Sequence, residues 1–173
     1  MQRRRLVTSS VGFLAVILVA TLGVIQVVSA DAAKIDVATI SVNPGATGFL
    51  IPVTVTTQDA PGMAAFDVTI TYDNSVINVT GRQDGPSGFS LTDNLTAGSA
   101  RVAGFTFGTS ASGSFNLFNL VATAVGSAGA STNLTMTVTS YGDSGGSAIT
   151  IGTTQNGSVT INTPSTFSIS PST

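Results

Sequence analysis

The chain contains no histidine, cysteine, glutamate or tryptophan. Without histidine or cysteine it cannot assemble a Ser-His-Asp or Cys-His catalytic device, nor a zinc site of the usual ligands. Its eight acidic residues are aspartates scattered singly along the chain, so the paired carboxylates of a glycosidase find little support. The sequence therefore predicts that the protein is not an enzyme and holds no metal of its own.

Basic residues are also scarce, with six in 173 residues. Three of them stand together as Arg3, Arg4 and Arg5, which leaves Lys34, Arg82 and Arg101 in the rest of the chain. So few positive charges cannot form the basic patch that holds a phosphate backbone, and nucleic acid is excluded as a partner.

The first thirty residues resemble an export signal. The arginine head is followed by an uncharged apolar run over residues 11–28 and by small residues ending at Ala30. This order is typical of a cleaved signal peptide over residues 1–30. The alternative is an uncleaved membrane anchor, since about 18 apolar residues is near the lower limit for a span. Either way the remainder is expected outside the cytoplasm, secreted or at the cell surface.

The remainder is predicted to be one domain, residues 31–162, followed by a Pro/Ser/Thr-rich tail or linker over residues 163–173. Apolar and polar residues alternate there, and Gly/Pro/Asn/Asp turns interrupt the pattern about every ten residues, which is typical of an all-β sandwich. The expected strands cover residues 35–42, 49–57, 64–72, 76–80, 89–91, 101–107, 117–125, 134–140, 148–151 and 158–161.

The segment 64–72 shows the alternation most clearly. Its residues Phe66, Val68, Ile70 and Tyr72 share one face and are expected in the core, because successive side chains of a strand point to opposite sides. Asp67, Thr69 and Thr71 occupy the other face. On residues alone, that second face is either a binding row or simply the solvated side of a sheet.

Three local features carry further expectations. Pro52 cannot donate to a strand ladder, so its strand is expected at a sheet edge or at a bulge. The alternation fails at Phe118 and Asn119, which indicates a bulge or a strand buried on both sides. Asp73 is expected to stabilise the turn into Asn74 and Ser75.

An ordered set of motifs runs through residues 35–162. IPVTV is followed by FDVTITYDNSVINV, then by ARVAGFTF, LFNLVATAVGSAGASTNLTMTV and the closing NGSVTIN. Together they resemble a cohesin domain. The resemblance implies a nine-stranded jelly-roll β-sandwich that binds a dockerin, a small helical calcium-binding module, through one flat sheet face. It implies no cofactor on this chain, with calcium expected on the dockerin partner.

The resemblance also assigns candidate partner-binding residues. Asp67 matches the outward-facing aspartate of the family motif, six residues before Asp73, and Thr69 and Thr71 continue its row. Arg101, at the start of strand 101–107, is a further candidate for the same face. The asparagine often found two residues before the aspartate is replaced here by Ala65, so one polar contact to a dockerin would be missing.

Two other functions remain open on sequence. A carbohydrate-binding module would bind polysaccharide, usually on an aromatic platform, yet the chain has no tryptophan and two tyrosines. A structural surface or adhesion domain would use the same sandwich without any dockerin partner.

Four Asn-x-Ser/Thr sequons make possible glycosylation sites in an exported protein. They begin at Asn78, Asn94, Asn133 and Asn156.

Overall fold

The structure is a computed structural model that describes residues 33–57, 61–108 and 110–164. The proposed signal or anchor segment lies outside the described residues, as does the tail beyond residue 164. The described part forms eleven β-strands, where the sequence pattern predicts ten and the resemblance implies nine. They are β1 (Ala33–Val37), β2 (Thr39–Val42), β3 (Phe49–Thr57), β4 (Ala65–Thr71), β5 (Ile77–Gln83), β6 (Ser90–Thr96), β7 (Ser99–Phe105), β8 (Phe115–Ala124), β9 (Ser131–Gly142), β10 (Ile151–Gln155) and β11 (Gly157–Ile161).

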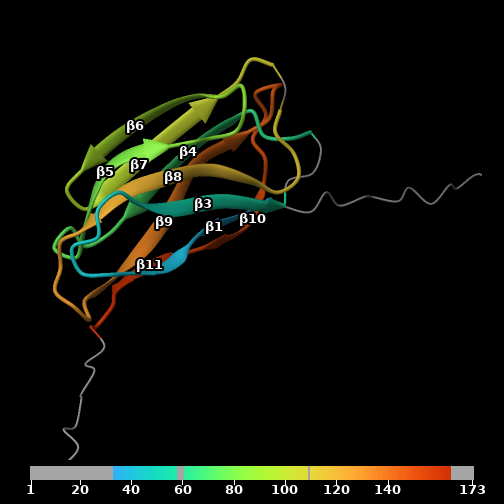
Figure 1. Cartoon of the computed structure of the whole chain (residues 1–173). Helices are drawn as coiled ribbons and strands as arrows, with labels where there is room; N and C mark the ends of the chain where they lie inside the picture. Colours follow the sequence, from blue (N-terminus) through green and yellow to red (C-terminus); the bar gives the residue numbers. More distant parts are fainter. Residues whose placement is uncertain (1–32, 58–60, 109, 165–173) are drawn as a thin grey trace, which may run out of the picture.

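The strands form two sheets that pack face to face (Figure 1). One sheet has the order β10-β1-β3-β8-β5, and the other has the order β2-β11-β9-β4-β7-β6. The alternation in the sequence puts the apolar side of each strand between them, as in β4, where Phe66, Val68 and Ile70 are buried as expected. The ring of Phe66 stacks on Phe118 of the opposite sheet, with 6.1 Å between centroids. Apolar packing of this kind holds together a chain without cysteine.

The segment 35–42, expected as one strand, contributes to both sheets. Its first part, β1, pairs in parallel with β10, and its second part, β2, pairs in parallel with β11. Ala38 lies at the crossing, and its amide donates to the Pro52 carbonyl at 3.0 Å. Gly157 passes so close to this crossing that a Cβ there would lie 2.6 Å from the Val37 carbonyl oxygen. The continuous alternation of the sequence hides this change of sheet.

The prediction that Pro52 marks an edge strand is wrong, because β3 lies in the middle of its sheet between β1 and β8. The carbonyl of Pro52 points toward Ala38, just beyond the end of β1. The backbone nitrogen of Pro52, which carries no hydrogen, faces the same side. No ladder bond of β1 is therefore lost. The alternative prediction is confirmed, since β3 carries a bulge opposite β1, where Thr56 is the extra residue between Val55 and Thr57. A second irregularity lies where β3 meets β8, since their register shifts between Val53 and Thr54.

The same irregularity explains the break of alternation in β8. The partners of Val53 and Thr54 are Phe118 and Asn116, so Leu117 is the extra residue of the bulge. Leu117, Phe118, Asn119 and Leu120 are consecutive and all buried, as the sequence pattern indicated.

Two strands extend well beyond the expected ranges. The predicted strand 89–91 covers only the start of β6, which continues to Thr96. The predicted strand 148–151 overlaps β10 only at Ile151, because β10 covers residues 151–155. Both are edge strands, and most of their side chains are exposed. Without a buried row, these segments show little of the alternation on which the predictions depend.

Candidate partner-binding face

The outer face of the six-stranded sheet carries the candidate residues. In β4, Asp67, Thr69 and Thr71 alternate with buried residues and therefore point away from the core, as expected. The pairing of β4 with β7 and β9 extends this face on both sides, and its outward side chains are predominantly small or hydroxylic. They are Ser99, Arg101, Ala103 and Phe105 of β7, and Thr135, Thr137 and Ser140 of β9.

Arg101 and Asp67 form a two-point ion pair on this face. Arg101 lies directly opposite Thr69, one diagonal step from Asp67. Its Nε donates to Oδ1 of Asp67 at 2.9 Å, and its Nη2 donates to Oδ2. The Asp67 side chain is 14% exposed and that of Arg101 is 56% exposed. The arginine therefore covers the aspartate and presents its own remaining N–H groups to solvent.

The pairing changes how both groups titrate. The hydrogen bond from Arg101 holds the pKa of the Asp67 carboxyl below its usual value, and the positive charge of Arg101 adds to the effect. The same hydrogen bond, together with the negative charge of Asp67, raises the pKa of Arg101. Because the aspartate pKa is lowered on folding, the pair stabilises the fold above the unfolded-state pKa, and this contribution disappears only as the pH falls through the lowered value.

The other candidates of β4 lie beside this pair. Thr69 stands between Arg101 of β7 and Thr137 of β9. Thr71 is exposed, and its hydroxyl donates to the Thr135 carbonyl at 3.4 Å. The structure thus brings Asp67, Thr69, Thr71 and Arg101 onto one surface.

Two aromatic residues near this face were missed as candidates in the sequence. Phe105 is 46% exposed and Phe107 is 98% exposed, and their rings meet edge to face with centroids 5.1 Å apart. Phe105 follows Arg101 and Ala103 in strict alternation, so counting by twos from Arg101 would have placed it on the outer face.

Tyr72 and Asp73 behave as expected. Tyr72 is buried in the core, and its hydroxyl donates to the Thr96 carbonyl at 3.1 Å. Asp73 stabilises its turn by accepting from the Ser75 hydroxyl at 2.7 Å and from the Ser75 amide at 2.8 Å. These two bonds lower the pKa of Asp73, with the hydroxyl bond the larger cause.

The four sequon asparagines are all exposed in the described structure. Asn94 lies directly opposite Arg101 on the outer face of the six-stranded sheet, and Asn133 belongs to the same face. Asn78 lies on the opposite sheet, in β5. Asn156 uses its side-chain oxygen to accept the Met136 amide at 2.9 Å.

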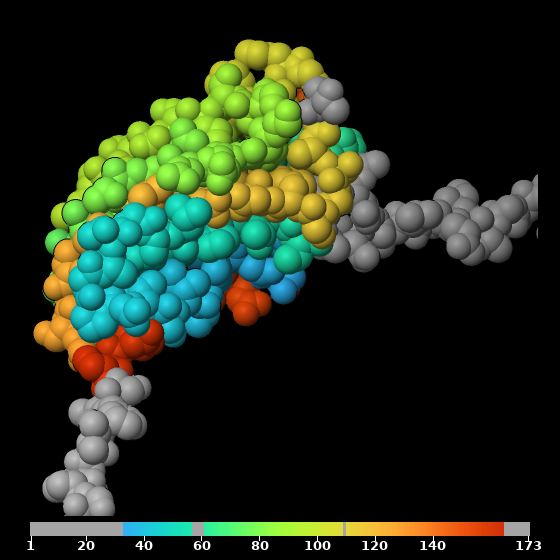
Figure 2. Space-filling view, in the orientation of Figure 1, coloured from blue at the N-terminus to red at the C-terminus, as the bar shows by residue number. Residues whose placement is uncertain are grey.

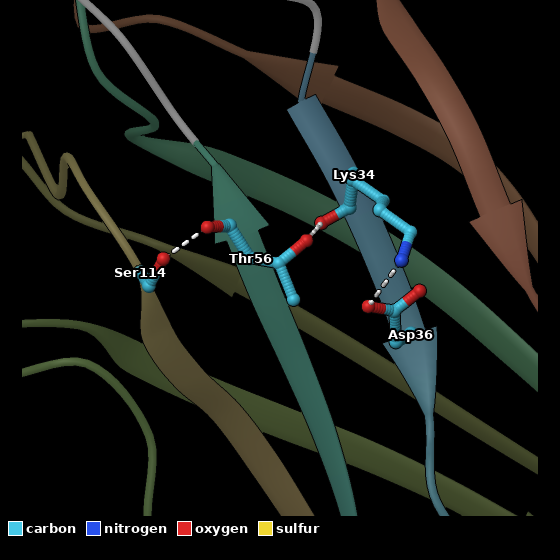
Figure 3. A network of polar contacts seen from close by, with 4 residues as sticks. All are labelled: Lys34, Asp36, Thr56 and Ser114. Carbon is cyan, nitrogen blue, oxygen red and sulfur yellow. Dashed lines mark hydrogen bonds and ion pairs between the residues drawn. The ribbon is translucent and has the colours of Figure 1, made fainter.

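The outer face of the five-stranded sheet offers a polar network of a different kind (Figure 3). Lys34 and Asp36 form an ion pair along β1, with 3.2 Å between Nζ and Oδ2. Thr56 of β3 donates to the Lys34 carbonyl, and Ser114 donates to the Thr56 carbonyl. These bonds link neighbouring segments of the sheet and its margin, which indicates a structural role.

Within residues 33–57, 61–108 and 110–164, no helix is long and apolar enough to cross a membrane. The same residues contain no group of three or more histidine, cysteine, aspartate or glutamate side chains that could hold a metal ion.

The family model of the cohesin domain matches residues 33–161. The chain belongs to the cohesin family. Cohesins are non-catalytic protein–protein interaction modules, which supports the prediction that this protein is not an enzyme. Comparison of the chain with curated proteins gives no match.

Solved cohesin structures share the fold. A non-cellulosomal cohesin from Archaeoglobus fulgidus is 18% identical, with a TM-score of 0.66 over 76% of this chain and 92% of that one. The seventh type I cohesin of scaffoldin ScaB from Pseudobacteroides cellulosolvens is 13% identical, with a TM-score of 0.67 over 82% and 99%. The sixth cohesin of scaffoldin B from Acetivibrio cellulolyticus, solved with a dockerin, is 20% identical, with a TM-score of 0.65 over 76% and 99%. The predicted jelly-roll β-sandwich is thus confirmed.

Proposed function

We propose that this cohesin domain binds a dockerin-bearing partner outside the cytoplasm, through the outer face of its six-stranded sheet. The observation that carries the proposal is the Asp67–Arg101 pair, set among outward hydroxyl groups on a rigid sheet. Membership of the cohesin family supports it, as do similar cohesins that were solved in complex with dockerins. The basic and apolar N-terminal segment supports the location.

The chemistry of the face suits a helical partner. Side chains fixed on a sheet have little conformational entropy left to lose on binding. The hydroxyls of Thr69 and Thr71 offer donors and acceptors, while the exposed N–H groups of Arg101 would take carbonyl or carboxylate oxygens of the partner. Calcium would be held by the dockerin.

A pull-down tests the proposal directly. The domain is offered to dockerin modules encoded in the same genome, with calcium and with a chelator. We expect calcium-dependent capture. Asp67→Ala should weaken it about ten-fold or more, because Arg101 then loses the carboxylate that orients its side chain. Asp36→Ala is the matched control, since Asp36 is also paired with a cation but lies on the other sheet.

Absence of capture by every calcium-loaded dockerin would contradict the proposal and leave a structural or adhesion domain. Equal weakening by both substitutions would place the contact elsewhere. A glycan array separates out the remaining alternative, a polysaccharide-binding module.

A further inference from the structure

An apolar surface begins at the end of β7. Phe105 points outward there, opposite Ala65 of β4 on one side and Ser90 of β6 on the other. Phe107 lies in the loop that follows β7, which projects at the top of the molecule in the view of Figure 2. Its ring is almost fully exposed and packs edge to face against Phe105. Two aromatic rings exposed side by side are an unusually large apolar surface for a small domain.

A hollow continues this surface on the other side of Ala65. Ala65 pairs with Gly142 of β9, so both residues at this point of the sheet are small. The hollow has a volume of about 450 Å³ and is lined by Ala65, the outward-facing Ser140, and the apolar side chains of Ile149 and Ile151 among others. We name Phe107, Phe105, Ala65 and this hollow the apolar band.

The apolar band borders the ion pair of the proposed docking face. Ala103 follows Phe105 in the outward row of β7 and lies opposite Asp67. The carboxylate of Asp67 is already neutralised by Arg101. This end of the face therefore offers apolar surface next to a closed ion pair. The carboxylate of Asp143, which also lines the hollow, accepts the amides of Gly145 and Ser147 in its own loop.

We propose that the apolar band is the anchor of dockerin docking: a dockerin helix inserts an apolar side chain over Ala65 into the hollow and against Phe105. The inference rests on the proposed function and specifies its contact chemistry. Continuity with the proposed face and the internal neutralisation of Asp67 support an uncharged occupant. A large side chain buried in a pocket is the kind of contact that dominates binding energy in protein interfaces. The small side chain of Ala65, which leaves room at the rim of the hollow, is then a feature of specificity.

Three variants test the inference on the full domain, with affinities measured against calcium-loaded dockerin modules. Phe105→Ser removes one wall of the band, and we expect at least ten-fold weaker binding. Ala65→Asn places an amide at the rim of the hollow, and we expect a similar loss. Leu50→Ser is the matched control, because Leu50 is 40% exposed on the opposite sheet, and binding should change less than two-fold. Thermal melting verifies that each variant is folded.

The outcomes separate the two proposals. If Ala65→Asn tightens binding, the partner makes a polar contact at this position, and the inference is wrong. If Phe105→Ser binds as the unmodified protein does while Asp67→Ala fails to bind, docking stands and the apolar anchor falls. If no dockerin binds the unmodified domain, the proposed function fails and the inference falls with it.

Discussion

At the scale of single residues, two buried tyrosines show how differently a polar group can be accommodated. The hydroxyl of Tyr72 reaches the Thr96 carbonyl at the end of β6. The hydroxyl of Tyr141 is also buried, but it has no hydrogen-bond partner among the described residues, and burial raises its pKa. Sequence alone cannot distinguish these cases, because what faces each hydroxyl depends on segments distant in the sequence.

This contrast predicts opposite responses to the same substitution. Tyr72→Phe should lower the free energy of unfolding by about 0.5–1.5 kcal/mol, since it leaves the Thr96 carbonyl without its donor. Tyr141→Phe should leave the free energy of unfolding unchanged or raise it by up to about 1 kcal/mol, because it removes a polar group that is buried unpaired. Denaturant titration measures both values. A larger loss from Tyr141→Phe than from Tyr72→Phe would contradict the prediction.

At the scale of elements, β11 approaches the crossing between β1 and β2 so closely that no side chain fits between them. Gly157 opens β11 and is buried against the carbonyl groups of Val37 and Ala38. Any side chain here would force backbone apart, because neither neighbour is the flexible end of a side chain.

We therefore expect Gly157→Ala to destabilise the domain by about 2 kcal/mol or more, through overpacking against fixed backbone. Gly108→Ala is the matched control, since a Cβ there meets no atom within 4 Å, and it should change stability by less than about 0.5 kcal/mol. Thermal and denaturant unfolding of the two variants give the comparison. Equal stabilities would show that the crossing relaxes easily.

The elements also show how far the sequence carries. Strands with one buried row, such as β4 and β9, could be placed because burial imposes a period of two on their residues. Edge strands β6 and β10, and the change of sheet at Ala38, could not, because nothing in their side-chain pattern reports which backbone pairs with which. The outward row Asp67, Thr69 and Thr71 was predicted from the same alternation. The clamp of Arg101 on Asp67 depends on the β4–β7 register, which sequence does not reveal.

At the scale of the whole molecule, the position of a glycan decides whether it would interfere with docking, because the sequons lie on two different outer faces. Asn94 lies opposite Arg101 on the proposed docking face, whereas Asn78 lies on the outer side of the five-stranded sheet. A bulky glycan on Asn94 would cover Arg101 and exclude a partner.

Expression in a host that glycosylates Asn-x-Thr sequons tests this separation. We expect domain carrying a glycan on Asn94 to lose dockerin capture, and Asn94→Gln made in the same host to regain it. Asn78→Gln should have no effect on capture. Mass spectrometry establishes which asparagines are occupied. Full capture by domain that is modified at Asn94 would place the contact on another surface.

The pairing of β1 with β10 and of β2 with β11 joins the beginning of the domain to its end. During synthesis or export, β1 and β2 are therefore made more than a hundred residues before their parallel partners β10 and β11. Until then β1 and β2 are open edges that can pair with other chains. Contacts so distant in sequence also make folding slow, on the scale of milliseconds to seconds for all-β domains. This topology makes closure of the two sheets a late event, so β1 and β2 keep a strand edge open to aggregation until β10 and β11 have been made.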